Sequence, residues 1–502
     1  MTWLTLLALL PLVGGILVAF LKGSTGRAVG LVVSLATLVL AVVVAVLHSR
    51  GAELSEYALW IKSFGAYYAL DVDGMGLLMV VLTAILVPVV LVAERHLDET
   101  NGRWGAHTFT ALVLVLESFA LFVFMASDVL LFYVFFEATL IPMYFLIAGR
   151  GGPRRAAAAV KFLLYSLAGG LVMLFGVIGL GFASASVGAP SYLVEDLARI
   201  PLAPGLEMAL FVSFFVAFAI KAPMVPVHTW LPATTEEATP GTSTLLVGVL
   251  DKIGTFGMIK FCLALFPVAS KQAAPIVITL AVISIIYGAL AAIGQTNLMR
   301  LIAFTSVSHF GFMVMGIFVF TTQSINGSIF YMLNHGFSTA ALFLAVGYLV
   351  RRRGSADIGA FGGVMQVAPV AAGVTLFAGL AGLSLPGLGS FVGEFLVIAG
   401  TWSRLPWVAA ISTIAMVLAA LYILIMYQRV HTGPVTEQTR RHITTDLSGW
   451  ERLAVAPVMI LLLITGLFPK PVLDVIEPVA KQAMSHVQAT DPAPVVGNGG
   501  KR

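Results

Sequence analysis

Four charged side chains lie inside long apolar stretches of this sequence: Glu137, Lys221, Lys252 and Glu394. A charge at the centre of a membrane helix costs roughly 3 kcal/mol on insertion scales, and intramembrane charges are functional by default. Carboxylates and ammonium groups both gain and lose protons. Their presence in apolar surroundings therefore predicts a path that moves protons or other cations.

The spacing of two of these charges places them deep in a membrane. Glu137 follows Asp128, a residue type that caps helix starts, and lies about 13 Å into its helix at 1.5 Å per residue. Lys252 follows Gly241 and lies about 16 Å deep by the same rise. Both depths are close to the middle of a bilayer.

Proline and glycine interrupt two apolar stretches beside the charges. The segment APMVPVHTWLP follows Lys221, and the segment LPGLGS precedes Glu394. A broken helix frees backbone groups that must line a cavity or pack in protein, and such helices often mark transport pathways. We therefore predict two discontinuous helices, each with a charge at its break.

Three histidines lie in apolar surroundings: His228, His309 and His335. Imidazole titrates near neutral pH, so these side chains are candidate relays between the charged groups. The alternative is that each is a core histidine with satisfied hydrogen bonds. Metal binding is not expected, because no HxxxH or HExxH spacing gathers them on one helix face.

The charges also have structural alternatives. Glu137 with Lys221, and Lys252 with Asp251, could be buried ion pairs with no role in transport. The role of Glu117, one predicted helix before Glu137, stays open.

Two further lysines, Lys161 and Lys260, could extend toward a membrane interface with their stems in apolar surroundings.

The composition indicates an all-α polytopic membrane protein. Of 502 residues, 59% are apolar and 10% charged, with a mean hydropathy of +1.00, whereas soluble domains carry about 25% charged residues. The single Cys262 excludes an internal disulfide or a Cys-rich cluster, and PGLGSFVGE misses the dinucleotide-binding spacing. We expect no cofactor, metal or nucleic acid on this chain.

About fourteen apolar stretches are long enough to cross a bilayer, which needs about 20 residues. They lie near 2–21, 28–47, 74–93, 108–126, 129–148, 158–184, 206–238 (broken), 241–267, 274–295, 301–320, 326–349, 369–401 (broken), 407–428 and 452–469. The loop at 48–73 is expected to hold interface aromatics or a short covering hairpin. The tail after Lys470 is expected to be polar and frayed.

Loop charge predicts that both termini lie on the non-cytoplasmic side. The loops then assigned to the cytoplasm hold Lys22, Arg27, Arg95, Arg103, Arg150, Arg154, Arg155, Arg300, Arg351, Arg352, Arg353, Arg429, Arg440, Arg441 and Arg452. The outer loops hold only Arg50, Lys62, Arg199, Lys271 and Arg404.

The two breaks lie about 160 residues apart, as an internal duplication would leave them. We predict N-terminal helices over 1–107, a five-helix repeat over 108–267, a second five-helix repeat over 268–432, and a last helix with its tail over 433–502.

Five motifs carry a resemblance to a known family: FFEATLIPMYFLIAGRGG, KAPMVPVHTWLPATTEEATPGTSTLLVGVLDKIGTFGMIKF, RLIAFTSVSHFGF, LNHGFSTAALF and LPGLGSFVGEF. They resemble the antiporter-like membrane subunits of the proton-pumping NADH:quinone oxidoreductase, respiratory complex I. EATLIPMY and the short tail favour a branch without the long C-terminal helix of subunit L. Ala233 and Thr235 depart from the family, in which many members carry Asp and His.

The resemblance implies fourteen helices with two inverted five-helix repeats. It implies a glutamate–lysine pair, a central lysine and a terminal charged residue that move protons; these roles fall on Glu137, Lys221, Lys252 and Glu394. The expected path enters near the first pair, passes the central lysine and histidines, and leaves near the last glutamate.

The resemblance also implies partners and a location. FMN, iron–sulfur clusters and quinone are expected in partner subunits of complex I, which include neighbouring antiporter-like subunits, and the inner (plasma) membrane is the expected site. Alternatives are a subunit of a cation/proton antiporter complex, a membrane subunit of a hydrogenase-like complex, and a structural subunit that does not pump.

Overall fold

The computed structural model describes residues 2–21, 23–96 and 105–493. Within them, twelve helical passes are long and apolar enough to cross a membrane. They are α1 (Trp3–Phe20), α2 (Gly23–Ser49), α3 (Gly74–Ala93), α4 (Ala106–Met125), α5 (Val129–Ala138) with α6 (Leu140–Gly149), α7 (Arg155–Val187), α9 (Pro204–Lys221), α13 (Pro267–Ile293), α14 (Leu298–Phe318), α15 (Thr322–Arg353), α19 (Pro406–His431) and α21 (Gly449–Leu467). Helices are required here because bilayers offer backbone groups no water.

Two further passes are interrupted. One runs through α11 (Pro240–Leu245), a π-helical turn (Leu246–Leu250), α12 (Lys252–Gly257) and a second π-helical turn (Met258–Leu263); the other consists of α17 (Pro369–Gly382) and α18 (Gly389–Arg404). With these, the described residues form fourteen passes, the number that the sequence predicts. The break between α17 and α18 lies where the sequence predicts it, and the break predicted within 206–238 separates α9 from a short helix at Trp230–Glu237. The interruption within 241–267 was not predicted. Their grouping into two repeats stays a prediction.

The shorter helices lie between or beside the passes. They are α8 (Val194–Leu197), α10 (Trp230–Glu237), α16 (Val364–Val367), α20 (Glu437–His442) and α22 (Lys470–His486), with 3-10 turns at Lys62–Phe64 and Ile358–Ala360.

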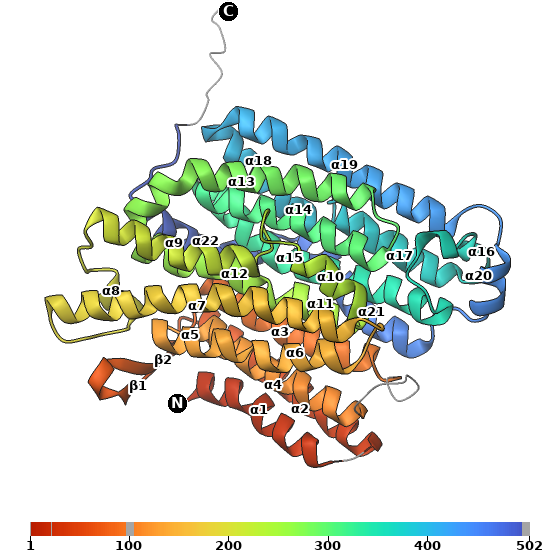
Figure 1. The fold of residues 1–502 in the computed structure, drawn as a ribbon, viewed down its shortest axis with the longest axis horizontal. Helices are drawn as coiled ribbons and strands as arrows, with labels where there is room; N and C mark the ends of the chain where they lie inside the picture. The colour runs from red at the N-terminus through yellow and green to blue at the C-terminus, as the bar shows by residue number, and fades with distance from the viewer. Residues whose placement is uncertain (1, 22, 97–104, 494–502) are drawn as a thin grey trace, which may run out of the picture.

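The centre of the bundle is formed by α14 and α15, whose apolar windows are 100% buried. By contrast, 28% of the α2 window and 33% of the α19 window are buried, and Figure 1 shows α1 and α2 at one edge of the molecule and α19 at the other. The edge helices therefore leave apolar faces for lipid or for other subunits. These two central helices carry His309 and His335.

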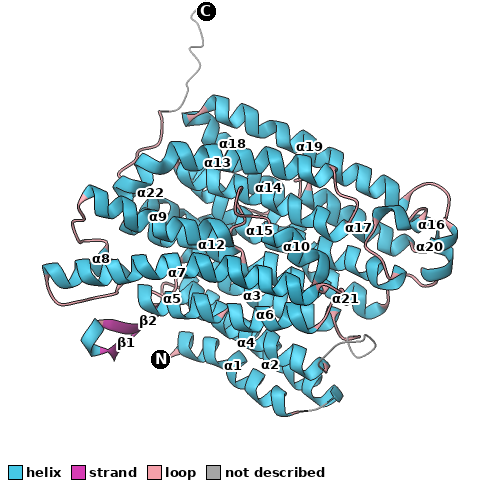
Figure 2. Cartoon of the chain, in the orientation of Figure 1, coloured by secondary structure: helices cyan, strands magenta, loops and turns pink. Residues whose placement is uncertain are grey.

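A β-hairpin lies in the loop at 48–73, where the sequence predicts interface aromatics or a hairpin. β1 (Ser55–Ile61) pairs antiparallel with β2 (Ala66–Asp71), with an irregularity between Leu59 and Ile61. Figure 2 shows it as the magenta pair beside the N-terminus. Gly65 at the turn has φ 66° and faces the Pro190 carbonyl so closely that a Cβ would not fit. The loop therefore forms a hairpin, and its role as an interface belt stays a prediction.

The expectation of a frayed tail after Lys470 is wrong as far as the structure describes the chain. Lys470–His486 forms α22, which buries Ile476, Val479, Ala480 and Ala483. Their spacing of three and four residues makes one apolar face, while charges such as Lys481 cover the other. The segment is polar on average, so its composition alone does not indicate this apolar face. Residues 494–502 lie outside the described residues.

An ion pair joins the start of α3 to the end of the interrupted pass. Asp73 caps α3 by accepting from the Gly76 backbone N–H at 2.7 Å, and Lys260 Nζ lies 3.0 Å from Asp73 Oδ2. Burial raises the pKa of the Asp73 carboxyl, but Lys260 and the Gly76 N–H outweigh it and hold this pKa below its usual value. Lys260 thus has a defined carboxylate partner.

Arginines and glutamates form several ion pairs at the ends of the helices. Arg300 pairs with Glu236 at 2.9 Å, and Arg352 pairs with Glu451 at 2.6 Å. These arginines belong to the loops that the charge rule assigns to the cytoplasm. Two members of that set, Lys22 and Arg103, lie outside the described residues.

Candidate functional site

Lys221 is the last residue of α9, immediately before the predicted break. Its side chain is 1% exposed, and its Nζ has no hydrogen-bond partner among the described residues. The ammonium instead lies 5.4 Å from the Phe136 ring centroid and 5.6 Å from that of Phe162. Aromatic faces attract cations, so these two rings stabilise the buried charge in part.

Glu137 lies near the end of α5, on the Phe136 side of Lys221. Its Oε1 is buried and unpartnered within the described chain. Gly170 of α7 lies directly against the carboxylate, which occupies the space a Cβ would need. Glu137 and Lys221 interact electrostatically, but neither Glu137 Oε1 nor Lys221 Nζ has a hydrogen-bond partner in the described residues. The two groups of the predicted pair therefore lie open, without direct contact between the ammonium and Oε1.

Lys252 begins α12, between the two π-helical turns. Its Nζ donates to the Val247 carbonyl at 2.8 Å and lies 2.7 Å from His335 Nδ1 on α15. The Phe310 ring centroid is 4.7 Å from the same nitrogen. π-helical turns are frequent at functional sites, and here they hold a fully buried lysine against a titratable ring.

Aromatic rings continue from His335 toward the next helices. The His309 ring on α14 lies 5.2 Å from the His335 ring at an interplanar angle of 83°. Tyr331 is 5.7 Å from His309 and 6.1 Å from His335, measured between ring centroids. Because Tyr331 and His335 are four residues apart on α15, they share one helix face.

Glu394 on α18 is the last member of the series of contacting side chains that begins at Lys252. Tyr331 Oη donates to Glu394 Oε2 at 3.3 Å, and the Ser384 hydroxyl donates to the same oxygen. Gly393 packs on the backbone of Tyr331 so tightly that a Cβ would lie 2.7 Å from the Tyr331 Cα. This close approach of α18 to α15 brings the neighbouring carboxylate to the tyrosine. Lys252 and Glu394 are thereby joined by contacts between buried side chains.

The second break positions Ser384. This residue has φ 58°, a left-handed conformation that non-glycine residues rarely adopt. Such backbone strain persists only where surrounding structure holds it, and it clusters at functional sites. Here it turns a hydroxyl donor toward Glu394.

His228 lies apart from this series. It sits in the break after α9, where its ring contacts Tyr287 at 5.1 Å and Phe304 at 6.1 Å. Neither ring nitrogen has a hydrogen-bond partner among the residues described. Of the three predicted relay histidines, the structure therefore brings His309 and His335 together with Lys252, but not His228.

Sequence reasoning missed three polar members of the series. Tyr331 lies four residues before His335, a spacing that could have revealed it. Ser384 lies beside the second break. The sequence analysis identified that break but did not single out the Ser384 hydroxyl. Tyr422 of α19, whose Oη lies 3.4 Å from His309 Nε2, comes from a helix without a break, whose basic residues lie only in its last turn.

In the part of the chain that the structure describes, no group of three or more His, Cys, Asp or Glu could hold a metal ion.

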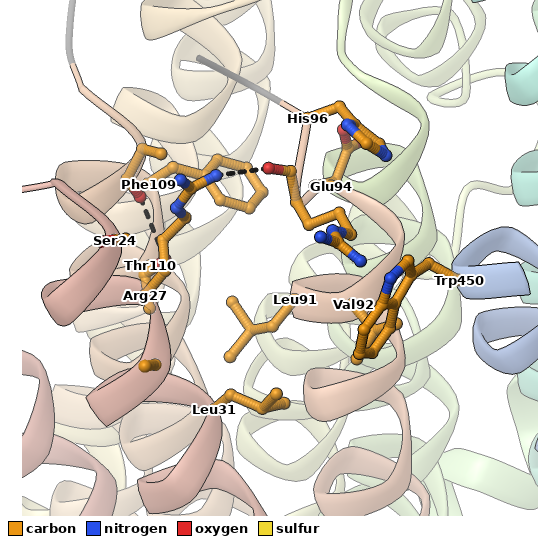
Figure 3. Close-up of a pocket in the computed structure, with 13 residues that line it drawn as sticks. Ser24, Arg27, Leu31, Leu91, Val92, Glu94, His96, Phe109, Thr110 and Trp450 are labelled. Carbon is orange, nitrogen blue, oxygen red and sulfur yellow. Dashed lines mark hydrogen bonds between the residues drawn. The ribbon is translucent and has the colours of Figure 1, made fainter. Parts of the chain in front are cut away.

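A pocket of about 500 Å³ lies among the ends of α2, α3 and α4, with Trp450 from α21 at its wall. Figure 3 shows Arg27 and Trp450 on opposite sides of an apolar floor that includes Leu31 and Leu91. The guanidinium of Arg95 lies 4.2 Å from the centroid of the Trp450 ring. The lining includes none of the residues that join Lys252 to Glu394.

The arrangement can be compared with known proteins. Residues 126–420 match the family described as NADH:quinone oxidoreductase/Mrp antiporter, transmembrane. The chain belongs to this family.

Relatives define its place within the family. NADH-quinone oxidoreductase subunit M of Mycobacterium tuberculosis (strain H37Rv) is 47% identical, covering 99% of this chain and 96% of the relative. A chain of respiratory complex I from Thermus thermophilus is 31% identical with a TM-score of 0.88, covering 97% of this chain and 100% of that one. Within the family, this chain is therefore similar to subunit M of NADH-quinone oxidoreductase.

A chain of the Mrp complex from Dietzia sp. DQ12-45-1b is 21% identical with a TM-score of 0.85, covering 97% of this chain and 99% of that one. At this identity the likeness concerns the fold alone.

Proposed function

We propose that this subunit carries protons through the buried side chains described above, driven by quinone reduction elsewhere in the complex. The path enters near Glu137 and Lys221, continues to Lys252 and leaves near Glu394. The observation that supports it best is the run of contacts between Lys252 and Glu394, because side chains in sequential contact can hand a proton on without exposing it to solvent.

The chemistry of the second part of the path follows from the hydrogen bond at His335. While Lys252 is an ammonium it can only donate, so His335 Nδ1, 2.7 Å away, then accepts and Nε2 carries the proton of the neutral ring. When Nδ1 takes a proton from the ammonium, Nε2 can release one toward His309 and Tyr331. The Glu394 carboxylate, held by two hydroxyl donors, is the acceptor at the end.

The first part of the path works by changes in distance. An opposite charge nearby favours the charged form of an ionisable group, and burial disfavours it. Lys221 keeps its proton while the Glu137 carboxylate is near and ionised, and releases it when that carboxylate moves away or is neutralised. One pKa unit corresponds to about 1.4 kcal/mol, so a modest movement redirects the proton.

The partners and orientation follow from the same proposal. FMN, iron–sulfur clusters and quinone belong to partner subunits, and neighbouring antiporter-like subunits contact the apolar edges. The chain lies in the inner membrane with both termini on the non-cytoplasmic side, which the distribution of Lys and Arg supports.

Lys252→Met tests the function directly. In membrane vesicles with assembled complex, proton uptake per NADH oxidised should fall roughly tenfold or more, because loss of a positioned acid–base group costs that much or more. Lys62→Met, in the outer hairpin, is the matched control and should pump normally. Normal pumping by Lys252→Met would support a structural subunit, and cation exchange without NADH oxidation would support an antiporter.

A further inference from the structure

Asp251 is a buried carboxylate that the path above does not use. It is 0% exposed, and neither Oδ1 nor Oδ2 has a hydrogen-bond partner in the described residues. More than about nine in ten buried polar groups in proteins are hydrogen-bonded. Two unpartnered oxygens on one buried carboxylate therefore call for an explanation.

The packing of α12 turns Asp251 toward the end of α9. Gly254 is three residues further along and shares its helix face. A Cβ on Gly254 would lie 2.5 Å from both the Phe218 carbonyl oxygen and the Ala222 amide nitrogen. Those two atoms flank Lys221 in the chain, so this face of α12 is pressed against the α9 terminus.

Asp251 is also the charged group that the two lysines share. It interacts electrostatically with Lys252, its neighbour in sequence, and with Lys221. Lys221 has one other such partner, Glu137, and Lys252 has none among the described residues. The contacts described above give no titratable side chain between Lys221 and Lys252. Asp251 interacts with both lysines and therefore fills this step.

We propose that Asp251 is a further proton-carrying residue that passes protons from Lys221 to Lys252. In the first step an Nζ–H bond of the Lys221 ammonium breaks and an O–H bond forms on the carboxylate, which leaves two neutral groups. In the second step that O–H bond breaks and the neutral Lys252 amine gains the proton. The carboxylate is regenerated and the net charge is unchanged. This inference rests on the proposed path.

The alternative role for Asp251 is that of a permanently ionised counter-ion for Lys252. A buried ion pair stabilises its charges only with close geometry and additional hydrogen bonds. Asp251 has no hydrogen bond and no ion-pair contact in the described residues, unlike Asp73 with Lys260 at 3.0 Å. Because no donor among the described residues holds either Asp251 oxygen in place, the carboxylate is free to gain and lose a proton during turnover.

The main test compares carboxylate variants in the assembled complex. Asp251→Asn should lower proton uptake per NADH at least about tenfold, whereas Asp251→Glu should keep most of it. Glu117→Gln is the matched control: Glu117 on α4 is 1% exposed, its oxygens are also unpartnered, and no charged group interacts with it among the described residues. Normal pumping by assembled Asp251→Asn would overturn the proposal.

Infrared difference spectra taken during turnover separate a carrier from a counter-ion. A carrier gives a protonated carboxyl band that shifts in Asp251→Glu, and this readout holds even if Asp251→Asn fails to assemble. A spectrum identical in wild type and Asp251→Glu would reject the carrier.

Lys221→Ala and Lys252→Met, measured beside Asp251→Asn, separate a failure of the proposed path from a failure of the role of Asp251. If they pump normally, the proposed path itself is wrong; if they do not and Asp251→Asn does, only the role of Asp251 is wrong.

Discussion

The region around Lys221 and the region between Lys252 and Glu394 hold the same kinds of group in opposite arrangements. Near Lys221, the ammonium faces phenylalanine rings and its glutamate makes no contact with it. From Lys252 onward, hydrogen bonds and ring contacts connect each side chain to the next. On the proposed path, the first region must change its geometry to pass a proton. The second has hydrogen bonds at its two ends and ring contacts in its middle, where His335 Nε2 has no hydrogen-bond partner among the described residues.

The largest effect is expected at the open pair. Lys221→Ala should lower pumping and coupled turnover roughly tenfold or more, and Glu137→Ala should do the same. Glu137→Asp should be milder, because it keeps the charge at a slightly greater distance. Proton uptake by vesicles checks all three, and a fully assembled Lys221→Ala complex that pumps normally would remove the first region from the path.

Tyr331→Phe should have the next largest effect, because it deletes the hydroxyl that reaches Glu394. A single hydrogen bond contributes about 0.5–1.5 kcal/mol, so the pumping rate should fall between about twofold and tenfold. Tyr287→Phe, at the ring beside His228, is the matched control. Equal rates for the two variants would show that the second region does not conduct through Tyr331.

Gly393→Ala should separate α18 from α15 and lengthen the Tyr331–Glu394 contact. Overpacking of a tight interface costs typically 1–3 kcal/mol, so both thermal stability and pumping should decline. Gly373→Ala introduces the same methyl group on α17 where nothing lies within 4 Å. Melting of the detergent-extracted complex, measured for both, distinguishes the close approach from a general effect of alanine.

The smallest effect is expected at His228, which makes no contact with the second region. His228→Gln should change pumping less than about twofold, while His335→Gln should lower it as strongly as the loss of a proton carrier does. A large loss in assembled His228→Gln would show that the break after α9 conducts protons and would make the two regions alike.

The sequence predicted the passes and the charges better than their contacts. Uniform apolar stretches define helices in a membrane, and an isolated Lys252 or Glu394 is conspicuous within them. The contacts of Tyr331 and Tyr422 depend on which helices pack together, and tyrosine in an apolar helix carries no special signal. α22 was missed because its apolar face is visible only as a spacing of three and four residues.

The π-helical turns on both sides of Lys252 limit how the length of this segment can vary. Each residue of a helix turns the chain by about 100°, and a π-helical turn accommodates one extra residue per turn. Deleting one residue from Leu246–Leu250 would allow an ordinary α-helix while rotating Lys252 away from His335. Descendants of this sequence can therefore exchange apolar residues within the turn, but insertions and deletions there should be rejected.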